Sequence, residues 1–514
     1  MTTQVNYASS SLGDDELERR FEEALAEVRS TTSPVEPQLI GEREIYEGRI
    51  VERFDPCVPS ARVAAAHQAT AQHVAAAVAA ARAQTKSWRN TPYAERIARL
   101  RAARVVAAYR IVEMAAIVSA ETGKTRLEAV GEAQEVLDMI EHYCALMEDN
   151  NGYCAPLKST ESETNVDLLL PWGAFAVIAP YNFPVALAVG MMVGALVTGN
   201  TVVLKPSDKT PRSTATVAGI LRDELPAGVL NVVHGGAEVG RALAASEVDG
   251  IAFTGSAKVG WELVNSTAPS GMPRPVLAEM GGQNPAIVAR SADLDLATSG
   301  IVRSAFGLSG QKCSACRRVV VDEAVADELI ERIAAAAERL VVGDPLDPSS
   351  DLGPVIDDVI AKRIDDALEI ARSEGRVVTG GRIAGRRGNF FAPIVVTDLP
   401  LGHCLTREEL FAPFLTITRV ATFADAMDEA NAVAYGLSAG VFSTDENELA
   451  TFVDEIQAGV IYVNRAAGAT TGAWPGVQSF CGWKLSGSSG KGGLGNWYLP
   501  GFMREQSRTI MGQP

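Results

Sequence analysis

Hydrophobic residues near the start of the chain follow a helical spacing. Leu17, Phe21, Leu25 and Val28 recur on one helical face in an acidic background, which predicts an amphipathic first helix. We expect this helix to belong to an N-terminal extension over residues 1–45. Its pattern is that of a surface helix packed on its own subunit.

The pattern stays helical from Val63 to about Met147, where Ala, Glu and Arg predominate, and it ends at the breaker run Asn150-Asn151-Gly152. This stretch predicts a helical layer. The next segment, Leu157 to Leu170, is largely polar, lacks helical periodicity and becomes apolar only at its end. We predict a projecting strand pair there, because exposed strands of this kind often pair between subunits.

Short apolar strands alternate with helices from Ala174 onward. The pattern predicts strands at 175–179, 201–204, 230–233 and 251–253, and helices at 185–197 and 214–225. This alternation predicts a parallel sheet with helices on both faces. A second alternating region, from Pro285 to about Asn464, predicts a separate α/β domain that faces the first across a cleft.

Composition narrows the classes of partner. The chain has 514 residues, of which 47% are hydrophobic, and this is enough for two or three domains with large cores. Its formal net charge of −17 argues against nucleic acid and membrane partners, since those interfaces are built on clustered Lys and Arg. The apolar run Val185–Val197 is too short to span a bilayer, and residues 1–20 show no secretory signal. We therefore expect a cytoplasmic protein.

The 7 cysteines are scattered and odd in number, which is typical of free thiols in a reducing compartment. Cys313 and Cys316 form a Cys-x-x-Cys pair. No second pair and no nearby His offers the remaining ligands of a zinc site. We therefore expect no bound metal.

Cys313 is the strongest candidate for chemistry. The segment Gly310-Gln311-Lys312-Cys313 places its thiol in a glycine-bounded loop between a helix-like segment and a strand. The thiolate is the reactive form of cysteine, and we expect the nearby cations Lys312, Arg317 and Arg318 to lower the thiol pKa. The alternative is a small buried cysteine without reactivity.

Three loops should border one crevice, since ligands bind beyond the carboxyl ends of parallel strands. These loops are Pro180–Asn182, Lys205–Asp208 and Thr254–Ser256. Lys205 can bind a ribose hydroxyl or a phosphate. Asp208 can accept bonds from a ribose diol and repels a 2′-phosphate, which favours NAD over NADP. A surface lysine and a helix-capping aspartate fit these two positions equally well.

Three further features fit the same crevice. Gly255 and Gly260 flank the start of a predicted helix, where backbone N–H groups and the positive helix end can bind a phosphate, although ordinary turns share this spacing. Glu279 stands in an apolar stretch, which should raise its pKa toward use as a general base; a salt-bridged structural glutamate is the alternative. Asn182 can direct its amide at an oxyanion or cap the following helix.

Six motifs, in this order, resemble the NAD(P)-dependent aldehyde dehydrogenase superfamily over about residues 50 to 510. They are Pro180-Tyr181-Asn182-Phe183-Pro184, Lys205-Pro206-Ser207, Phe253-Thr254-Gly255-Ser256, Glu279-Met280-Gly281-Gly282-Gln283-Asn284-Pro285, Gly310-Gln311-Lys312-Cys313 and Glu409-Leu410-Phe411-Ala412-Pro413. Their joint order is far more specific than any single motif.

The resemblance implies that Cys313 attacks an aldehyde, with the oxyanion held by the Asn182 amide and the Cys313 backbone N–H. Hydride then passes to the nicotinamide, and Glu279 activates the water that cleaves the thioester. NAD is the implied cofactor, with NADP possible, and family members are usually dimers or dimer-based assemblies. The implied cofactor-binding residues are Pro180, Lys205, Ser207, Asp208, Gly255, Ser256, Gly260, Met280, Glu409 and Phe411.

Further segments resemble the 1-pyrroline-5-carboxylate dehydrogenase branch, which oxidises glutamate γ-semialdehyde to glutamate. They are Gly310-Gln311-Lys312-Cys313-Ser314-Ala315-Cys316, Tyr462-Val463-Asn464-Arg465, Thr471-Gly472-Ala473 and Gly482-Trp483-Lys484-Leu485-Ser486-Gly487. The resemblance implies that Ser314 and the backbone of Gly472 and Ala473 anchor the substrate carboxylate. Trp474 follows this anchor in place of a smaller residue, and we expect its indole to reshape the aldehyde pocket. Another aliphatic or aromatic aldehyde is therefore the alternative substrate.

The implied fold is α/β, with a Rossmann-type parallel-sheet cofactor domain, an α/β catalytic domain and a small β oligomerisation arm. We expect the N-terminal extension to be followed by a helical layer that starts the cofactor-binding domain. The segments in order are 1–45 (extension), 46–155 (helical layer), 156–171 (oligomerisation strands), 172–280 (NAD-binding domain), 281–464 (catalytic domain) and 465–514 (completion of the pocket and arm).

Three rival functions fit the sequence less well. A CoA-acylating aldehyde dehydrogenase resolves the thioester with CoA instead of water, and a general base at Glu279 argues against it. A cysteine hydrolase needs a His base beside Cys313, and none of the 5 His lies in a matching motif. A catalytically silent nucleotide-binding protein would be expected to lack Cys313 or Glu279, and both are present.

Overall fold

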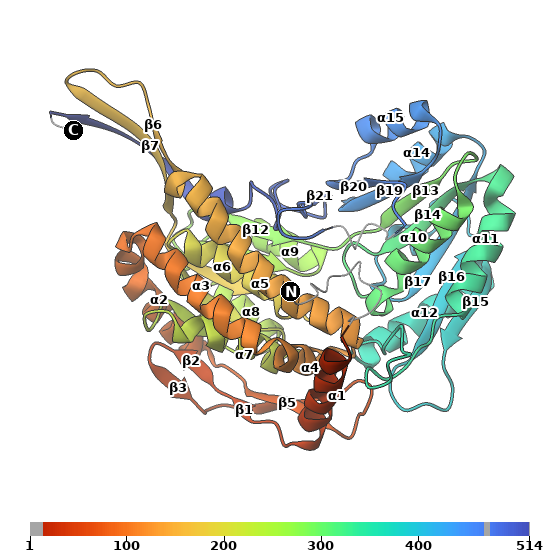
Figure 1. Cartoon of the computed structure of the whole chain (residues 1–514), viewed down its shortest axis with the longest axis horizontal. Coiled ribbons are helices and arrows are strands. Elements are labelled where there is room, and N and C mark those ends of the chain that lie inside the picture. Colours follow the sequence, from red (N-terminus) through yellow and green to blue (C-terminus); the bar gives the residue numbers. More distant parts are fainter. Residues whose placement is uncertain (1–13, 467–472, 513–514) are drawn as a thin grey trace.

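Two seven-stranded sheets organise residues 14–466 and 473–512, the part of the chain that this computed structural model describes (Figure 1). The first sheet has the order β12-β11-β8-β9-β10-β2-β3. Its strands from β12 to β10 run parallel, while β2 and β3 are antiparallel to their neighbours. The strands are β12 (Val276–Glu279), β11 (Gly250–Thr254), β8 (Ala174–Ile178), β9 (Thr201–Lys205), β10 (Leu230–Val232), β2 (Gln38–Ile40) and β3 (Arg43–Ile45).

Helices cover both faces of the first sheet, as the apolar strands predict. In β8, Phe175 and Val177 face one apolar core, whereas Ala174, Ala176 and Ile178 face another. The first core takes most of its helical residues from α3 (Tyr93–Tyr109), α4 (Ile111–Thr122), α5 (Arg126–Asp149), α6 (Ala186–Val197) and α7 (Pro211–Asp223), and the N-terminal helix also contributes to it. The second takes them from α2 (Ala71–Asn90), α8 (Ala237–Ala244) and α9 (Ala257–Val264).

The second sheet has the order β15-β16-β17-β14-β13-β19-β20. All of these strands run parallel except β15, which pairs antiparallel with β16. They are β15 (Arg376–Arg382), β16 (Phe391–Thr397), β17 (Phe414–Val420), β14 (Cys316–Asp322), β13 (Asn284–Val288), β19 (Ser438–Phe442) and β20 (Val460–Val463). The helices of this lobe are α10 (Leu294–Phe306), α11 (Glu323–Glu338), α12 (Asp358–Glu374), α13 (Cys404–Arg407), α14 (Phe423–Asn431) and α15 (Glu446–Glu455).

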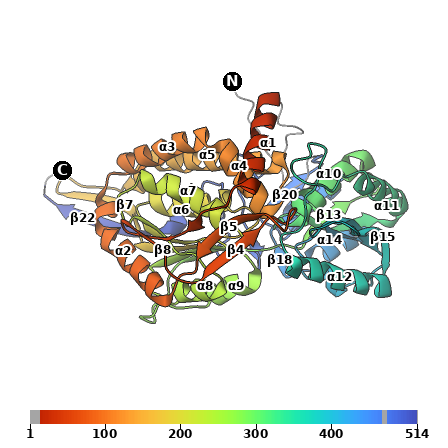
Figure 2. The same cartoon turned by 90° about the horizontal axis from the view of Figure 1, so that it is seen from below.

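The N-terminal region is more integrated than its sequence suggests. The amphipathic pattern forms helix α1 (Asp15–Ser30), which buries Phe21, Leu25 and Val28 and lies at the junction of the two lobes (Figures 1 and 2). Strands β2 and β3, from within residues 1–45, extend the first sheet. The predicted helix from Val63 is wrong at its start, since a small sheet forms there from β1 (Val35–Glu36), β4 (Ile50–Phe54) and β5 (Arg62–His67).

A three-stranded arm projects from the body of the molecule (Figure 1). It has the order β22-β7-β6, with β6 (Cys154–Pro156), β7 (Glu163–Pro171) and β22 (Met503–Met511). Strand β7 lies almost entirely in the segment 157–170 where a strand pair was predicted, but its partner β6 lies just before that segment, and the C-terminal strand β22 joins β7 on its other side. Within the described residues, no helix combines the length and the apolar character that crossing a membrane requires.

The remaining elements are short. They are η1 (Asn151–Tyr153), η2 (Gly307–Gly310), η4 (Leu499–Phe502), β18 (Tyr435–Gly436) and β21 (Trp483–Lys484). Two of them, η1 and η4, contact the arm strands β7 and β22, respectively.

Candidate active site

Several candidate residues lie at the carboxyl edge of the first sheet. Lys205 ends β9, Thr254 ends β11 and Glu279 ends β12, and these strands are parallel neighbours or share β8 between them. The three predicted loops therefore leave the sheet on one side. The loop that carries Cys313 comes from the other lobe, between η2 and β14.

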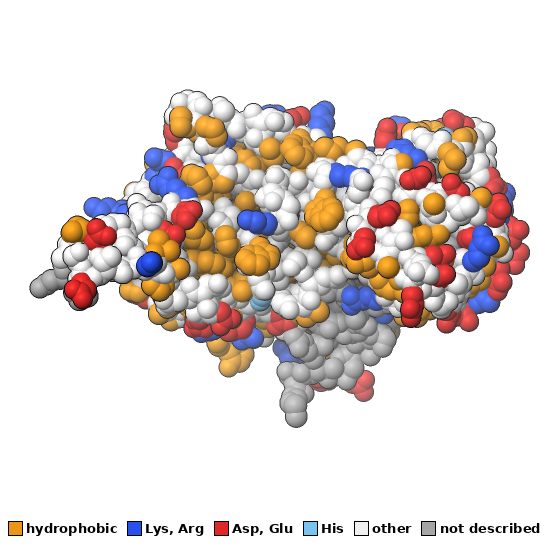
Figure 3. All heavy atoms as spheres, turned by 90° about the horizontal axis from the view of Figure 1, so that it is seen from above, with side chains coloured by type: hydrophobic (Ala, Val, Ile, Leu, Met, Phe, Trp, Pro, Cys, Tyr) orange, Lys and Arg blue, Asp and Glu red, His pale blue; other side chains and the backbone are white. Residues whose placement is uncertain are grey.

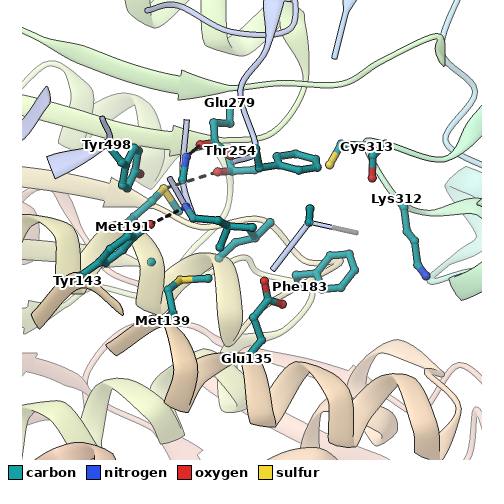
Figure 4. Close-up of a pocket in the computed structure, with 17 residues that line it drawn as sticks. Glu135, Met139, Tyr143, Phe183, Met191, Thr254, Glu279, Lys312, Cys313 and Tyr498 are labelled. Carbon is teal, nitrogen blue, oxygen red and sulfur yellow. Dashed lines mark hydrogen bonds between the residues drawn. The ribbon is translucent and has the colours of Figure 1, made fainter. Parts of the chain in front are cut away.

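Cys313 and Glu279 line the same pocket (Figure 4). The Cys313 sulfur is directed into the pocket, while the Lys312 side chain points away from it. Among the described residues that line this pocket there is no histidine. The lining is mainly apolar and consists of Glu135, Met139, Tyr143, Phe183, Leu187, Gly190, Met191, Thr254, Glu279, Lys312, Cys313, Ser314, Ala473, Phe480, Gly493, Leu494 and Tyr498.

The cations near Cys313 hold its loop, and the pKa of its thiol is raised despite their presence. Arg317 donates to the carbonyls of Gly310 and Lys312 at 2.5 and 3.0 Å, and Lys312 pairs with Glu128 at 3.3 Å. Arg318 donates to three backbone carbonyls on the far side of the loop. Burial and two nearby carboxylates raise the pKa of the Cys313 thiol to about 12, so the expected lowering by these cations is wrong.

Two backbone N–H groups oppose that rise. Those of Ser314 and of Cys313 itself bond the thiol and lower its pKa. Asn284 fixes the same loop, because its Nδ2 donates to the carbonyls of Cys313 and Ala315 at 2.8 and 2.9 Å. The loop is therefore held rigidly, with its amide hydrogens near the sulfur.

Glu279 is a carboxyl group in an apolar enclosure. Burial raises its pKa to about 7, in the direction that its apolar sequence context predicts. Its Oε1 accepts a 2.7 Å hydrogen bond from the Gly493 N–H, which opposes the rise. Among the described residues, Glu279 forms no salt bridge within 4.0 Å, so the reading as a salt-bridged structural glutamate is wrong.

Asn182 contacts the cysteine loop directly. Its Nδ2 donates to the Gln311 carbonyl at 2.9 Å, and the residue is buried. The alternative reading as a helix cap is wrong, because Glu132 accepts hydrogen bonds from the N–H groups of Val185 and Ala186 at the start of α6. The amide of Asn182 is thereby placed beside the segment that carries Cys313.

Lys205, Ser207 and Asp208 follow β9 at the mouth of the crevice. The Lys205 ammonium donates to the carbonyls of Pro206 and Gly235 at 2.6 and 2.9 Å, and burial lowers its pKa to about 8. Lys205 and Ser207 are buried and Asp208 is exposed. Asp208 does not cap α7, whose first N–H groups bond to the buried Glu121.

The glycine pair does not act as a unit. Gly255 donates its N–H to the Glu279 carbonyl at 3.1 Å, and Ser256 caps α9. Gly260 lies inside α9 and donates to the Ser256 carbonyl at 2.9 Å, so its N–H is not directed at a phosphate. A Cβ at Gly260 would lie 2.3 Å from the Met280 sulfur, and this close packing explains the glycine.

Glu409 and Phe411 approach the first lobe from the second. Glu409 Oε1 accepts the Gly282 N–H at 3.0 Å, and a Cβ at Gly281 would lie 1.9 Å from Glu409 Oε2. Phe411 has a left-handed φ of 58° and its ring packs edge-on against Tyr181, with centroids 6.0 Å apart. A non-glycine residue in this conformation is costly, and such strain is concentrated at functional sites. Pro180 is buried beside these groups.

Two of the three residues predicted to bind the substrate carboxylate lie within the described part of the chain. Ser314 and Ala473 line the pocket, whereas Gly472 lies outside the described residues. Trp474 does not line the pocket, because its Nε1 donates to Asp138 on α5 at 2.8 Å. The expectation that this indole reshapes the pocket is therefore wrong.

Sequence reasoning missed several residues of the site. Glu135, Met139 and Tyr143 on α5 form one wall of the pocket, and Asn284 orders the cysteine loop. The signal for α5 was the helical spacing of these three residues, but a helix wall is not distinguishable from an ordinary core helix by spacing alone. Asn284 belongs to the segment Glu279-Met280-Gly281-Gly282-Gln283-Asn284-Pro285, yet its role depends on contacts with residues that are distant in the sequence.

A cysteine thiol directed into a pocket, a buried carboxyl group in the same pocket and a nucleotide-type sheet beside it define the site of an oxidoreductase with a cysteine nucleophile. The comparison with protein families shows that the chain belongs to the aldehyde dehydrogenase family, which matches residues 46–507. The implied aldehyde dehydrogenase fold is thereby confirmed, and solved structures agree with it.

Individual relatives point to one branch of this family. A "1-pyrroline-5-carboxylate dehydrogenase" of Geobacillus sp. (strain WCH70) is 36% identical over 500 residues, covering 96% of each chain. The "1-pyrroline-5-carboxylate dehydrogenase 2" of Bacillus subtilis (strain 168) is 36% identical over 520 residues, covering 99% of each chain. A solved 1-pyrroline-5-carboxylate dehydrogenase from Thermus with bound NAD superposes with a TM-score of 0.92 at 35% identity, covering 97% of each chain.

Proposed function

We propose that this protein is an NAD-dependent dehydrogenase that oxidises L-glutamate γ-semialdehyde, the open form of 1-pyrroline-5-carboxylate, to glutamate. The observation that carries the proposal is the pocket in which Cys313, Glu279 and Ser314 lie among apolar side chains. The named relatives, which this chain matches over nearly its whole length, support the same substrate.

The residues suggest a covalent reaction. The Cys313 thiol first gives its proton to solvent, its sulfur then adds to the aldehyde carbon, and the oxyanion that forms accepts hydrogen bonds from the Asn182 amide and the Cys313 backbone N–H. After hydride loss from that carbon, the product is a thioester on Cys313. Glu279 then takes a proton from water, which attacks the thioester and releases the acid and the thiol. A base at this position favours hydrolysis over transfer to CoA.

The residues of the crevice carry the charges and hydrogen-bonding groups that a dinucleotide such as NAD requires. The buried Lys205 ammonium and the start of α9 at Ser256 offer positive charge, while Glu409 and Asp208 offer acceptors for ribose hydroxyls. When bound, NAD supplies the hydride acceptor, and its positive ring favours the Cys313 thiolate. Asp208 repels a 2′-phosphate, and we therefore propose a preference for NAD over NADP.

The pocket also fits the shape and charge of the semialdehyde. Met139, Phe183 and Leu187 provide apolar walls for a short methylene chain. The Ser314 hydroxyl and the backbone at Ala473 lie in the pocket, where they can donate hydrogen bonds to the carboxylate of the semialdehyde. Glu135 on α5 also lines the pocket and brings a carboxyl group to that wall. The Trp474 side chain is bonded to Asp138 on α5 and does not line the pocket. It therefore gives no reason to prefer another aliphatic or aromatic aldehyde as the substrate.

We also propose a cytoplasmic dimer or dimer-based oligomer. The arm strand β22 pairs with β7 on one side only, and its other edge is exposed among the described residues. Exposed strand edges favour pairing with a second chain. All seven cysteines are free thiols, which is compatible with a reducing compartment.

The test is NAD reduction by the purified protein with glutamate γ-semialdehyde and with a panel of uncharged aliphatic and aromatic aldehydes. We expect the highest kcat/KM for the semialdehyde and no turnover by Cys313→Ala. A preference for an uncharged aldehyde would contradict the proposed substrate and leave the Cys313 reaction in place. Turnover of none of these aldehydes would contradict the proposed function itself.

A further inference from the structure

A buried ion pair lies behind the segment that carries Asn182. Lys124 follows α4 and Glu132 lies on α5; neither side chain is exposed, and the Lys124 ammonium donates to Glu132 Oε2. Neither of these two described residues lines the pocket. Two charges removed from water are costly and persist only when each has good partners, so their surroundings indicate what the pair supports.

Glu132 caps helix α6 from outside that helix. Its Oε1 accepts the N–H groups of Val185 and Ala186 at 2.9 and 3.2 Å. The first N–H groups of a helix have no partner within it, and Val185, at the capping position, provides no side-chain bond. The Glu132 carboxylate therefore fixes where α6 starts, immediately after the segment Asn182–Pro184.

Lys124 holds the same segment through an aromatic ring. Its Nζ lies 3.7 Å from the centroid of Phe183, the residue next to Asn182, and this is a cation–π contact. Phe183 in turn lines the pocket. The charge of Lys124 at this place is stabilised by Glu132, which opposes the lowering of its pKa by burial.

The geometry points to a positioning role: we propose that the Lys124–Glu132 pair holds the Asn182 amide at its place relative to Cys313. The pair holds the segment on the side of α5 and α6, and the 2.9 Å bond from Asn182 to Gln311 holds it on the side of the cysteine loop. This inference rests on the proposed dehydrogenase function, in which the amide stabilises the oxyanion. A hydrogen-bond donor displaced by about 1 Å loses about 100-fold in rate.

A double-mutant cycle between Glu132→Gln and Asn182→Ala tests the role. Glutamine keeps the volume and an acceptor for the two N–H groups but removes the charge that faces Lys124. We expect Glu132→Gln to lower kcat about 10- to 100-fold without changing the KM for NAD. In the Asn182→Ala background the same change should lower kcat by less than about 2-fold, because the amide through which the pair acts is gone.

Equal losses of kcat in both backgrounds would overturn the positioning role, because they would indicate a general loss of active enzyme. The amount of NAD bound per chain, measured by titration, counts intact sites, and kcat is expressed per intact site. Glu141→Gln, a half-exposed change on the same helix that removes the charge facing Arg101, is the matched control and should leave kcat unchanged. If Glu132→Gln does not fold, Lys124→Met combined with Glu132→Gln removes both charges and enters the same cycle.

The wild type separates the two proposals. Turnover of the semialdehyde with parallel losses in the cycle would refute the positioning role alone. A wild type that oxidises no aldehyde would refute the proposed function, and the positioning role would fall with it.

Discussion

Single residues at this site owe their chemistry to burial more than to neighbours in the sequence. Glu279 gains a pKa of about 7 because an apolar enclosure disfavours its charge. Cys313 has cations beside it in sequence, yet its thiol pKa rises to about 12, because those cations face backbone carbonyls and the same enclosure disfavours the thiolate. The pocket therefore keeps its nucleophile protonated and its base near neutrality.

The pKa of Glu279 should determine how kcat depends on pH. Only the carboxylate form of Glu279 can accept a proton from water, so we expect kcat to rise with pH through about 7. Glu279→Gln should lower kcat about 100-fold or more and remove this rise, as steady-state assays between pH 5.5 and about 8.5 will measure. Glu141→Gln is the control. A wild-type kcat that does not change with pH across this range would contradict the role.

The same shift has a consequence for stability. The pKa of Glu279 is higher in the folded chain than the ordinary value of 4.5 for a glutamate, so the folded state binds more protons between these two values. The folded state therefore loses stability as the pH rises from about 4.5 to about 7. Glu279→Gln should raise the thermal midpoint at pH 8 relative to wild type and leave it nearly unchanged at pH 4.

At the scale of elements, α1 links parts of the fold that are far apart in sequence. Arg29, near its end, pairs with the buried Asp55 at 2.6 Å and with Asp344 of the other lobe at 2.8 Å. Arg126, at the start of α5, pairs with Glu22 of α1 at 2.8 Å and donates to the carbonyl of Leu346. The helix therefore joins the two lobes beside the wall of the pocket.

Arg29→Ala should destabilise the protein by about 3 kcal/mol, because it leaves the Asp55 carboxylate buried without its partner. Chemical denaturation measures the change in the free energy of unfolding. Arg19→Ala on the exposed face of the same helix is the matched control and should change the stability far less than Arg29→Ala does, since its pairs with Glu16 and Glu23 face solvent. Equal effects of the two changes would show that α1 does not bind through Arg29.

At the scale of the whole molecule, the arm stands apart from the body and offers an edge to a second chain (Figure 1). On the face shown in Figure 3, apolar side chains gather over the middle of the molecule, next to the base of the arm. Charged side chains of both signs are interspersed over the opposite lobe on that face. A contact between two copies that uses the arm would cover this apolar area.

Removal of residues 504–514 should therefore convert the protein to monomers. The truncation deletes most of β22, leaves β7 without that neighbour and keeps the buried Phe502 and Met503. Light scattering coupled to gel filtration measures the mass. Arg508→Ala, a single change on the exposed strand, is the control and should keep the wild-type mass. A monomeric wild type, or an unchanged mass after truncation, would contradict the proposed assembly.

Local patterns determined much of this protein. Three features follow from residues that are close together in the sequence and could therefore be predicted without the structure. They are the helical spacing of α1, the strand–helix alternation of both lobes and the order of the six motifs. The motifs also predicted that Cys313, Glu279 and Asn182 meet, because their loops leave parallel strands at one edge or face that edge.

Only the tertiary structure decided the environment of each group. Trp474 turns onto Asp138, Gly260 makes room for Met280, and Glu132 rather than Asn182 caps α6. Each of these outcomes depends on a partner that is distant in the sequence, so no local pattern contains it. The protonation of Cys313 belongs here too, since burial is a property of the assembled pocket, and a list of nearby charges does not reveal which way those charges face.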